Sequence, residues 1–175
     1  MPRVTLVDET GKAIGAAEKL EVHQDGGRLH LAFSILVFNA EGELLLQRRA
    51  AHKYHFGGLW SNTCCGHPEP GEEVVTAGER RLGEELGFHV PLRPAYRFRY
   101  RAEDARSGLT EDELVEVLVG RYDGVPAANP EEVDAWRWQS VAEVRRDATH
   151  QPEAYTPWFR LMLARITDNP PVSRS

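Results

Sequence analysis

An almost continuous apolar run at residues 29–40 is the feature that most constrains how this chain folds. The run is rich in apolar and β-branched residues and is too short to span a membrane, so it predicts a buried strand. The turn-forming segment NAEGE follows at residues 39–43, and residues 44–49 return as the partner strand. This hairpin predicts a chain built around a β-sheet.

The remaining apolar and aromatic segments predict further strands and one early turn, which Gly11 and Gly15 flank. The strands are expected at residues 4–8, 95–101, 114–122 and 135–139, with a short extended piece at 60–65. Strands and helices are mixed without a strict βαβ rhythm. This arrangement predicts an α+β fold, with a mixed β-sheet between α-helices.

The clearest helix is expected at residues 74–86. The acidic Glu72 and Glu73 precede this segment and Gly87 ends it, as is typical of helix termini. Capping signals occur again at Ser140 with Glu143, and at Thr156 before Pro157. We expect one domain over residues 1–175, with a frayed tail after about residue 168.

Composition excludes several classes of protein. Apolar residues make up 41% of the chain and charged residues 27%, which are globular values. The N-terminus lacks the pattern of a signal peptide, so we expect a cytoplasmic protein without a membrane partner. The net charge of −6 argues against a nucleic-acid partner. The adjacent Cys64 and Cys65 are expected to be free thiols, because a disulfide ring so small is strained.

A spaced pattern surrounds the predicted helix: Gly66, Glu72, Arg80, Leu82, Glu84, Glu85, Gly87 and Phe88. It resembles the Nudix box, a loop–helix–loop that holds a divalent metal ion against a diphosphate. The family's hydrolases carry glutamate where this chain has Arg81, a cation able to contact a diphosphate through two hydrogen bonds. Glu84 and Glu85 remain, and Glu85 is the expected ligand of Mg²⁺. Without the surrounding box, a solvated acidic helix face would explain this pair equally well.

Three segments together resemble the type 1 isopentenyl-diphosphate isomerases: EKLEVHQDGGRLHLAFSILVFN, NTCCGHP and TEDELVE. The resemblance covers about residues 18–158. It implies a Nudix fold and an enzyme that interconverts isopentenyl diphosphate and dimethylallyl diphosphate. Such an enzyme protonates one carbon and deprotonates another, through a carbocation-like intermediate. The implied pathway is isoprenoid biosynthesis, including that of carotenoids.

The resemblance also implies a metal site made of His23, His30, His67, Glu111 and Glu113. Imidazole with carboxylate suits a divalent ion such as Mn²⁺ or Zn²⁺. Glu111 and Glu113 are two residues apart, so on a strand both side chains point to one face. A histidine taken alone is more often a surface or core residue than a ligand, and only the resemblance implies that the five converge.

By the same resemblance, Cys65 and Glu113 are the catalytic pair, assisted by Tyr100 and Trp158. Moving a double bond needs one group that donates a proton and another that accepts one. A free thiol has a pKa of about 8.5 and can stay protonated in a neutral site. Trp158 would stabilise the cation through its indole face. Both aromatic residues could equally be core side chains, and Cys64 is the better candidate for a small buried one.

The diphosphate needs cations, and the resemblance implies Lys19, Arg49, Lys53 and Arg81. Each could otherwise be an ordinary solvated surface charge. Arg48 and Arg49 are neighbours on a strand and point to opposite faces, so only one can face the pocket. We expect the protein to be a monomer or a weak homodimer.

The residues are compatible with two other functions. Glu84 and Glu85 favour a Nudix hydrolase of a diphosphate substrate, whereas Arg81 argues against one. A non-catalytic Nudix domain that binds a ligand or a partner gives no reason for the segment NTCCGHP.

Overall fold

A computed structural model describes residues 2–53 and 55–166, and the expected frayed tail lies outside them. The strands in the described residues are β1 (Arg3–Val7), β2 (Ala13–Glu18), β3 (His30–Phe38), β4 (Leu44–Arg49), β5 (Trp60–Ser61), β6 (Cys64–Gly66), β7 (Arg93–Glu103), β8 (Thr110–Arg121) and β9 (Val133–Gln139). The helices there are α1 (Lys19–Val22), α2 (Val74–Leu86), α3 (Val141–His150), the 3₁₀ turn η1 (Pro152–Ala154) and α4 (Pro157–Leu163).

The predicted buried strand is β3, and it organises the sheet. One edge of β3 pairs in parallel with β8 along its whole length, from His30 opposite Glu113 to Phe38 opposite Arg121. Its other edge meets three antiparallel strands in turn: β1, β6 and β4. β7 and β9 then extend the sheet, antiparallel to β8 and β4 respectively. The sheet is therefore mixed, as the sequence predicted.

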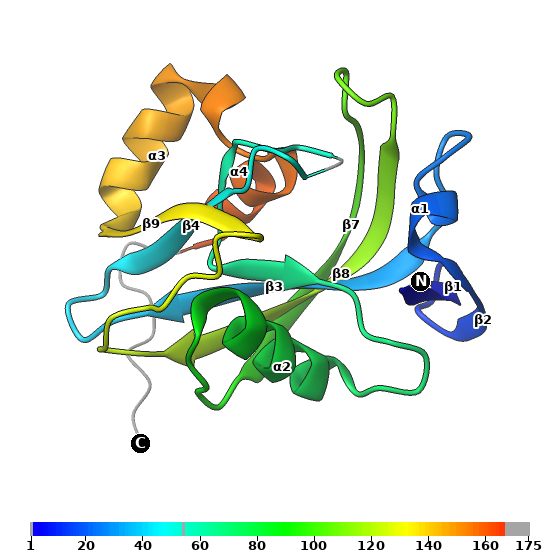
Figure 1. Ribbon diagram of the computed structural model, residues 1–175, viewed down its shortest axis with the longest axis horizontal. Helices are drawn as coiled ribbons and strands as arrows, with labels where there is room; N and C mark the ends of the chain where they lie inside the picture. The colour runs from blue at the N-terminus through cyan, green and yellow to red at the C-terminus, as the bar shows by residue number, and fades with distance from the viewer. Residues whose placement is uncertain (1, 54, 167–175) are drawn as a thin grey trace.

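Helices cover both faces of this sheet, with α2 on one side and α3 with α4 on the other (Figure 1). Alternate residues of β3 serve the two cores: Phe33 and Ile35 pack with the α2 residues Leu82 and Leu86, whereas Leu36 packs with α4. Burial on both faces explains why β3 is apolar throughout instead of alternating. The expected α+β arrangement is confirmed. No helix among the described residues has the length and apolar character needed to cross a membrane.

The N-terminal region differs from the prediction. Gly15 does not flank the early turn but lies inside β2, opposite Leu6 of β1. Gly11 does lie in the turn, with a φ of 88° that favours glycine. β2 and the four-residue helix α1 were not predicted, because AIGAAE lacks β-branched density and α1 is a single turn.

The helix predicted at residues 74–86 is α2, with the predicted bounds. Gly87 ends it in the left-handed conformation, at a φ of 72°. The two acids before it take different positions. Glu73 occupies the N-cap without a side-chain cap, while the Glu72 carboxylate accepts two hydrogen bonds of 2.9 Å from Arg80 instead.

Candidate active site

A cavity of about 460 Å³ opens where β3, β6 and β8 meet the N-terminus of α4. Most of the side chains singled out from the sequence line it: Lys19, Arg49, Lys53, Cys65, His67, Arg81, Glu111, Glu113 and Trp158. They come from segments far apart in the chain, and the pairing of β6 and β8 with opposite edges of β3 brings them together. Four predicted residues lie outside its lining: His23 and His30, which face Glu111 and Glu113, Tyr100, which packs against Trp158, and Glu85 on α2.

The three predicted histidines and two predicted glutamates converge at one end of this cavity. One potential ligand atom from each lies within 4.8 Å of every other: His23, His30, His67, Glu111 and Glu113. Both glutamates point to the same side of β8, as their spacing of two predicted. The group could therefore hold a metal ion.

Backbone carbonyls orient two of these histidines. Nδ1 of His23 lies 2.6 Å from the carbonyl oxygen of Lys19, and Nδ1 of His30 lies 2.8 Å from that of Arg28. Because a carbonyl only accepts, Nδ1 carries a proton in both rings, and Nε2 is the ring nitrogen that remains available to a metal ion. Nε2 of His30 faces Glu113 Oε2 at 3.4 Å. Rings held in this way are typical of metal-ligating histidines.

The electrostatics of the cluster also suit a divalent cation. Burial lowers the pKa of His30 to about 4 and lowers that of His67 well below its ordinary value, so both rings are neutral near pH 7. Burial and the neighbouring Glu111 carboxylate raise the pKa of Glu113 well above its ordinary value. Two buried carboxylates beside neutral imidazoles are a donor set that a divalent cation would neutralise.

Cys65 lies beside the cluster, on β6, and its thiol faces the cavity. Its Sγ is 3.1 Å from Oδ1 of Asn62 and 3.5 Å from Oγ of Ser34. Burial raises the pKa of the Cys65 thiol, so it is protonated near neutral pH. Trp158, from α4, contributes its indole ring to the same cavity.

Four cations predicted from the sequence also line the cavity: Lys19, Arg49, Lys53 and Arg81. The Arg49 guanidinium lies 5.3 Å from the centre of the Trp158 ring, whereas Lys53 and Arg81 contact Glu132. Arg48 lies outside this lining, with its guanidinium 5.8 Å from the centre of the Trp60 ring. A pocket lined by cations together with a thiol, carboxylates and an aromatic ring fits a small substrate with an anionic head and an apolar tail.

Comparisons with known proteins show the family to which this chain belongs. The NUDIX domain family model matches residues 28–159. A Halorhodospira halophila protein named isopentenyl-diphosphate Delta-isomerase is 54% identical over 164 residues, which cover 93% of this chain and 94% of the relative. A Pectobacterium atrosepticum protein of the same name is 47% identical over 168 residues, covering 96% and 93% respectively. This chain belongs to the isopentenyl-diphosphate Delta-isomerase family.

Solved structures agree on the NUDIX fold of this isomerase-family chain. A Deinococcus radiodurans protein, DR0079, has a TM-score of 0.78 at 21% identity, covering 93% of this chain and 98% of its own. A MutT protein from Methanosarcina mazei has a TM-score of 0.64 at 19% identity, covering 78% and 91%. At these identities the likeness concerns the fold alone.

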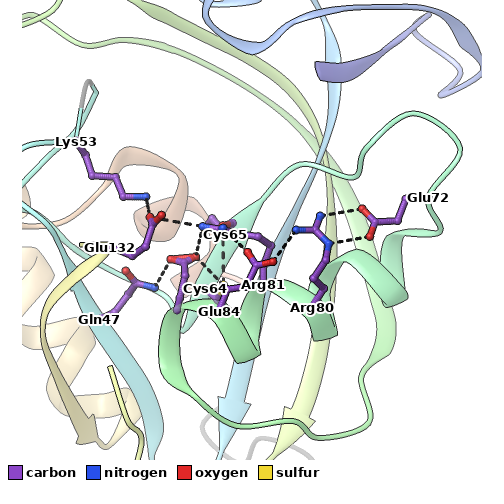
Figure 2. A network of polar contacts seen from close by, with 10 residues as sticks. Gln47, Lys53, Cys64, Cys65, Glu72, Arg80, Arg81, Glu84 and Glu132 are labelled. Carbon is purple, nitrogen blue, oxygen red and sulfur yellow. Dashed lines mark hydrogen bonds and ion pairs between the residues drawn. The ribbon is translucent and has the colours of Figure 1, made fainter. Parts of the chain in front are cut away.

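The Nudix helix of this isomerase-family protein carries a chain of ion pairs (Figure 2). Arg81, which stands where family hydrolases have glutamate, contacts Glu84 Oε2 at 2.6 Å and Glu85 Oε2 at 3.2 Å. It also lies 3.5 Å from Glu132, which in turn pairs with Lys53. Arg81 therefore pairs with both members of the Glu84–Glu85 pair.

Glu84 and Glu85 take different places in this network. Glu84 lines the cavity, whereas Glu85 is 3% exposed and lies outside the lining. The Glu85 carboxylate accepts hydrogen bonds from Gln47 Nε2 at 3.3 Å and Cys64 Sγ at 3.1 Å. Cys64 is buried, as its interpretation as a core residue requires, but its thiol also serves as a hydrogen-bond donor.

Tyr100 is 2% exposed and packs edge-to-face against Trp158, with the ring centres 5.9 Å apart. Burial, followed by the charges of Glu111 and Glu113, raises the pKa of its hydroxyl well above the ordinary value. In this position Tyr100 supports the Trp158 ring from behind.

Three further residues at the site were not identified from the sequence: His55, Asn62 and Glu132. His55 contacts Glu111 and stacks on His23, with ring centres 5.1 Å apart. Glu132 places a negative charge between Lys53 and Arg81. All three lie between regular elements, where no periodicity marks a residue, and only the folded chain brings them to their partners at the site.

Proposed function

We propose that this protein interconverts isopentenyl diphosphate and dimethylallyl diphosphate, with Cys65 and Glu113 as its proton-transfer residues. The observation that carries the proposal is that the Cys65 thiol and the buried Glu113 carboxylate line one cavity, together with the cations Lys19, Arg49, Lys53 and Arg81. Family membership supports it, since relatives at 54% and 47% identity bear the isomerase name.

The reaction needs a proton delivered to the terminal methylene carbon and another removed from the carbon next to the branched one. The double bond moves and the composition of the substrate is unchanged. Cys65 lies on β6 and Glu113 on β8, so they can reach the substrate from different sides. Positioned acids and bases of this kind contribute about 10²–10⁴-fold each.

Protonation leaves positive charge near the branched carbon, and Trp158 is proposed to stabilise it. An indole face contributes about 0.5–2 kcal/mol to such a cation, or up to roughly 30-fold in rate. Tyr100 packs behind this ring and is proposed to hold its angle. The larger share of the rate must come from positioning and proton transfer.

Lys19, Arg49, Lys53 and Arg81 are proposed to bind the diphosphate. Binding would exchange the contacts of Lys53 and Arg81 with Glu132 for contacts with phosphate oxygens. The charged head would thereby be fixed at the Nudix helix while the five-carbon tail extends toward Cys65 and Glu113. A cavity of about 460 Å³ suits a substrate of this size.

Two divalent ions belong to the proposal. His23, His30, His67, Glu111 and Glu113 fit one of them, for which we propose Mn²⁺ or Zn²⁺. When bound, it would neutralise the buried carboxylates and adjust the basicity of Glu113. Mg²⁺ is proposed to accompany the diphosphate, with Glu85 as its ligand. Glu85 would then have to give up one of its present contacts with Arg81, Cys64 and Gln47.

The cellular setting follows from this activity. The enzyme would supply the allylic starter of isoprenoid biosynthesis, including carotenoids, from the cytoplasm. We propose that it acts on its small substrate as a monomer or weak homodimer, without a nucleic-acid or membrane partner.

Incubation of the purified, metal-loaded protein with isopentenyl diphosphate tests the proposal against the hydrolase alternative. We expect an equilibrium mixture with dimethylallyl diphosphate and no release of phosphate or monophosphate. Phosphate release without isomerisation would favour a Nudix hydrolase, despite the contacts of Arg81 with Glu84 and Glu85. No reaction, together with neither a bound ion nor magnesium dependence, would favour a binding domain.

A further inference from the structure

Asn62 is a fully buried asparagine between β5 and β6, and its amide has one possible orientation. Nδ2 lies 3.1 Å from the carbonyl oxygen of Ile35 and 2.9 Å from that of Cys64. Both carbonyls only accept hydrogen bonds, so the amide nitrogen must face them. The side-chain oxygen is thereby directed to the other side.

That oxygen meets the two side chains to which we assign proton transfer and cation stabilisation. Oδ1 of Asn62 accepts a hydrogen bond of 3.1 Å from Nε1 of Trp158 and one of 3.1 Å from Sγ of Cys65. The indole N–H can only donate, which independently requires an oxygen at this position. Ser61 Oγ donates to the same atom at 2.8 Å.

We propose that Asn62 is a positioning residue that fixes the Cys65 thiol and the Trp158 indole relative to each other. The role assumes the proposed isomerase function. Cys65 comes from β6 and Trp158 from α4, 93 positions later in the chain, so neighbouring backbone cannot set their relation. One carbonyl oxygen, held in place by two backbone acceptors, is a rigid common reference for both.

The consequence for the reaction is geometric. Cys65 is proposed to transfer a proton at the same alkene whose positive charge Trp158 is proposed to face, so the thiol and the ring must both be aligned on that alkene. A misplacement of about 1 Å can cost about 100-fold in rate. The hydrogen bonds of the Asn62 side chain join it to Ile35, Cys64, Cys65, Ser61 and Trp158, none of which is proposed to bind the diphosphate, so substrate binding should be largely independent of it.

The test compares Asn62→Ala with the wild type by two measurements. The first is the indole N–H spectrum of protein labelled with ¹⁵N-tryptophan, in which Trp158→Phe assigns the Trp158 resonance. We expect Asn62→Ala to shift that resonance and leave those of Trp60, Trp136 and Trp138 in place. The second is steady-state kinetics, with kcat reduced about 10–100-fold and KM changed less than about 3-fold.

Asn39→Ala is the matched control, because Asn39 is also a buried asparagine, 8% exposed, with side-chain bonds to a turn. It should lower thermal stability without moving the Trp158 resonance or kcat. An unshifted Trp158 resonance in Asn62→Ala, or a kcat within about 3-fold of the wild type, would overturn the proposal.

If Asn62→Ala does not fold, the wild-type spectrum tests whether the Trp158 indole N–H is hydrogen-bonded. A resonance of Trp158 with a small temperature coefficient would indicate the hydrogen bond, whereas a solvent-like coefficient would overturn the proposal. The spectra need no substrate and so do not depend on the proposed function. If Asn62→Ala shifts the Trp158 resonance but the wild type does not isomerise isopentenyl diphosphate, the proposed function is contradicted and the placement of Asn62 is not.

Discussion

His67 and Glu113 are 46 positions apart in the chain, yet Nε2 of one lies 2.7 Å from Oε2 of the other. His67 follows β6 and Glu113 lies on β8, the two strands that pair with opposite edges of β3. The same arrangement places Nε2 of His30 at 3.4 Å from Oε2 of Glu113, and it brings Glu111 close to Glu113. Buried acids concentrated in this way cost stability when no cation is present, and that cost can be measured.

Glu113→Gln should stabilise the metal-depleted protein. The pKa of Glu113 is raised well above its ordinary 4.5 by burial and then by Glu111. For an acid whose pKa is raised by folding, the contribution to stability is fully present at a pH below its unfolded-state pKa. That contribution is lost as the pH rises toward the folded-state pKa. Removing the ionisable group should raise the free energy of unfolding at pH 7 by on the order of 1 kcal/mol or more, or about 2–4 °C in Tm.

Calorimetry of chelator-treated protein measures this difference. Glu116→Gln is the control on the same strand, since Glu116 is only partly buried and faces Arg97 at 3.5 Å. It should give no comparable gain. A Glu113→Gln protein less stable than the metal-depleted wild type at pH 7 would show that the buried carboxylates are not in conflict.

Cys65→Ser should reduce turnover by at least about 10²-fold, because an alcohol is a much weaker acid than the thiol it replaces. Conversion of isopentenyl diphosphate, measured with circular dichroism as a check on folding, gives the result. Cys64→Ser is the matched control: its side chain points to Glu85 and not into the cavity, and a hydroxyl can still donate there. Equal losses in the two variants would contradict the assignment of Cys65.

Removal of metal should abolish activity, and Mn²⁺ or Zn²⁺ should restore it. An ion at 100 times its Kd should add about 2.7 kcal/mol to the stability of the folded protein. His30→Ala should lose one equivalent of tightly bound ion by elemental analysis, whereas His150→Ala, on the exposed end of α3, should keep it. Full metal content in His30→Ala would show that the ion binds elsewhere.

Arg49→Gln should raise KM for the diphosphate substrate by roughly 10–100-fold. Hydrogen bonds to charged groups contribute about 1.5–3 kcal/mol, which corresponds to that range. Arg48→Gln supplies the control from the neighbouring position on β4, because Arg48 lies against Trp60 outside the cavity. Steady-state kinetics give KM for both variants. Equal increases in KM would contradict the assignment of Arg49 to diphosphate binding.

Sequence reasoning worked where a pattern repeats along one element. The apolar run of β3, the bounds of α2 and the shared face of Glu111 and Glu113 each follow from local periodicity. It failed for β2, whose alanines and glycine carry no strand signal. Sequence spacing also could not show that the two adjacent acids of α2 lie in different places. Glu84 lines the cavity, whereas Glu85 lies outside the lining and contacts Arg81 and Cys64.

The residues missed at the site share one physical reason. His55 and Asn62 act through partners that are remote in the chain: Glu111 for the first, Trp158 for the second. Neither follows a period, and a loop residue shows its role only when the fold supplies its partner. The resemblance to the isomerases identified the set that converges on the cavity, and the sheet register explains why that set meets.

Incorporation of solvent deuterium reports on the proposed proton transfer by Cys65 and Glu113. Wild-type protein loaded with metal is incubated with isopentenyl diphosphate in D₂O, and the allylic product is analysed by mass spectrometry and NMR. We expect deuterium in a methyl group of dimethylallyl diphosphate, and no such product from Cys65→Ser or Glu113→Gln. Allylic product that forms without deuterium, or labelled product formed at wild-type rates by either variant, would contradict it.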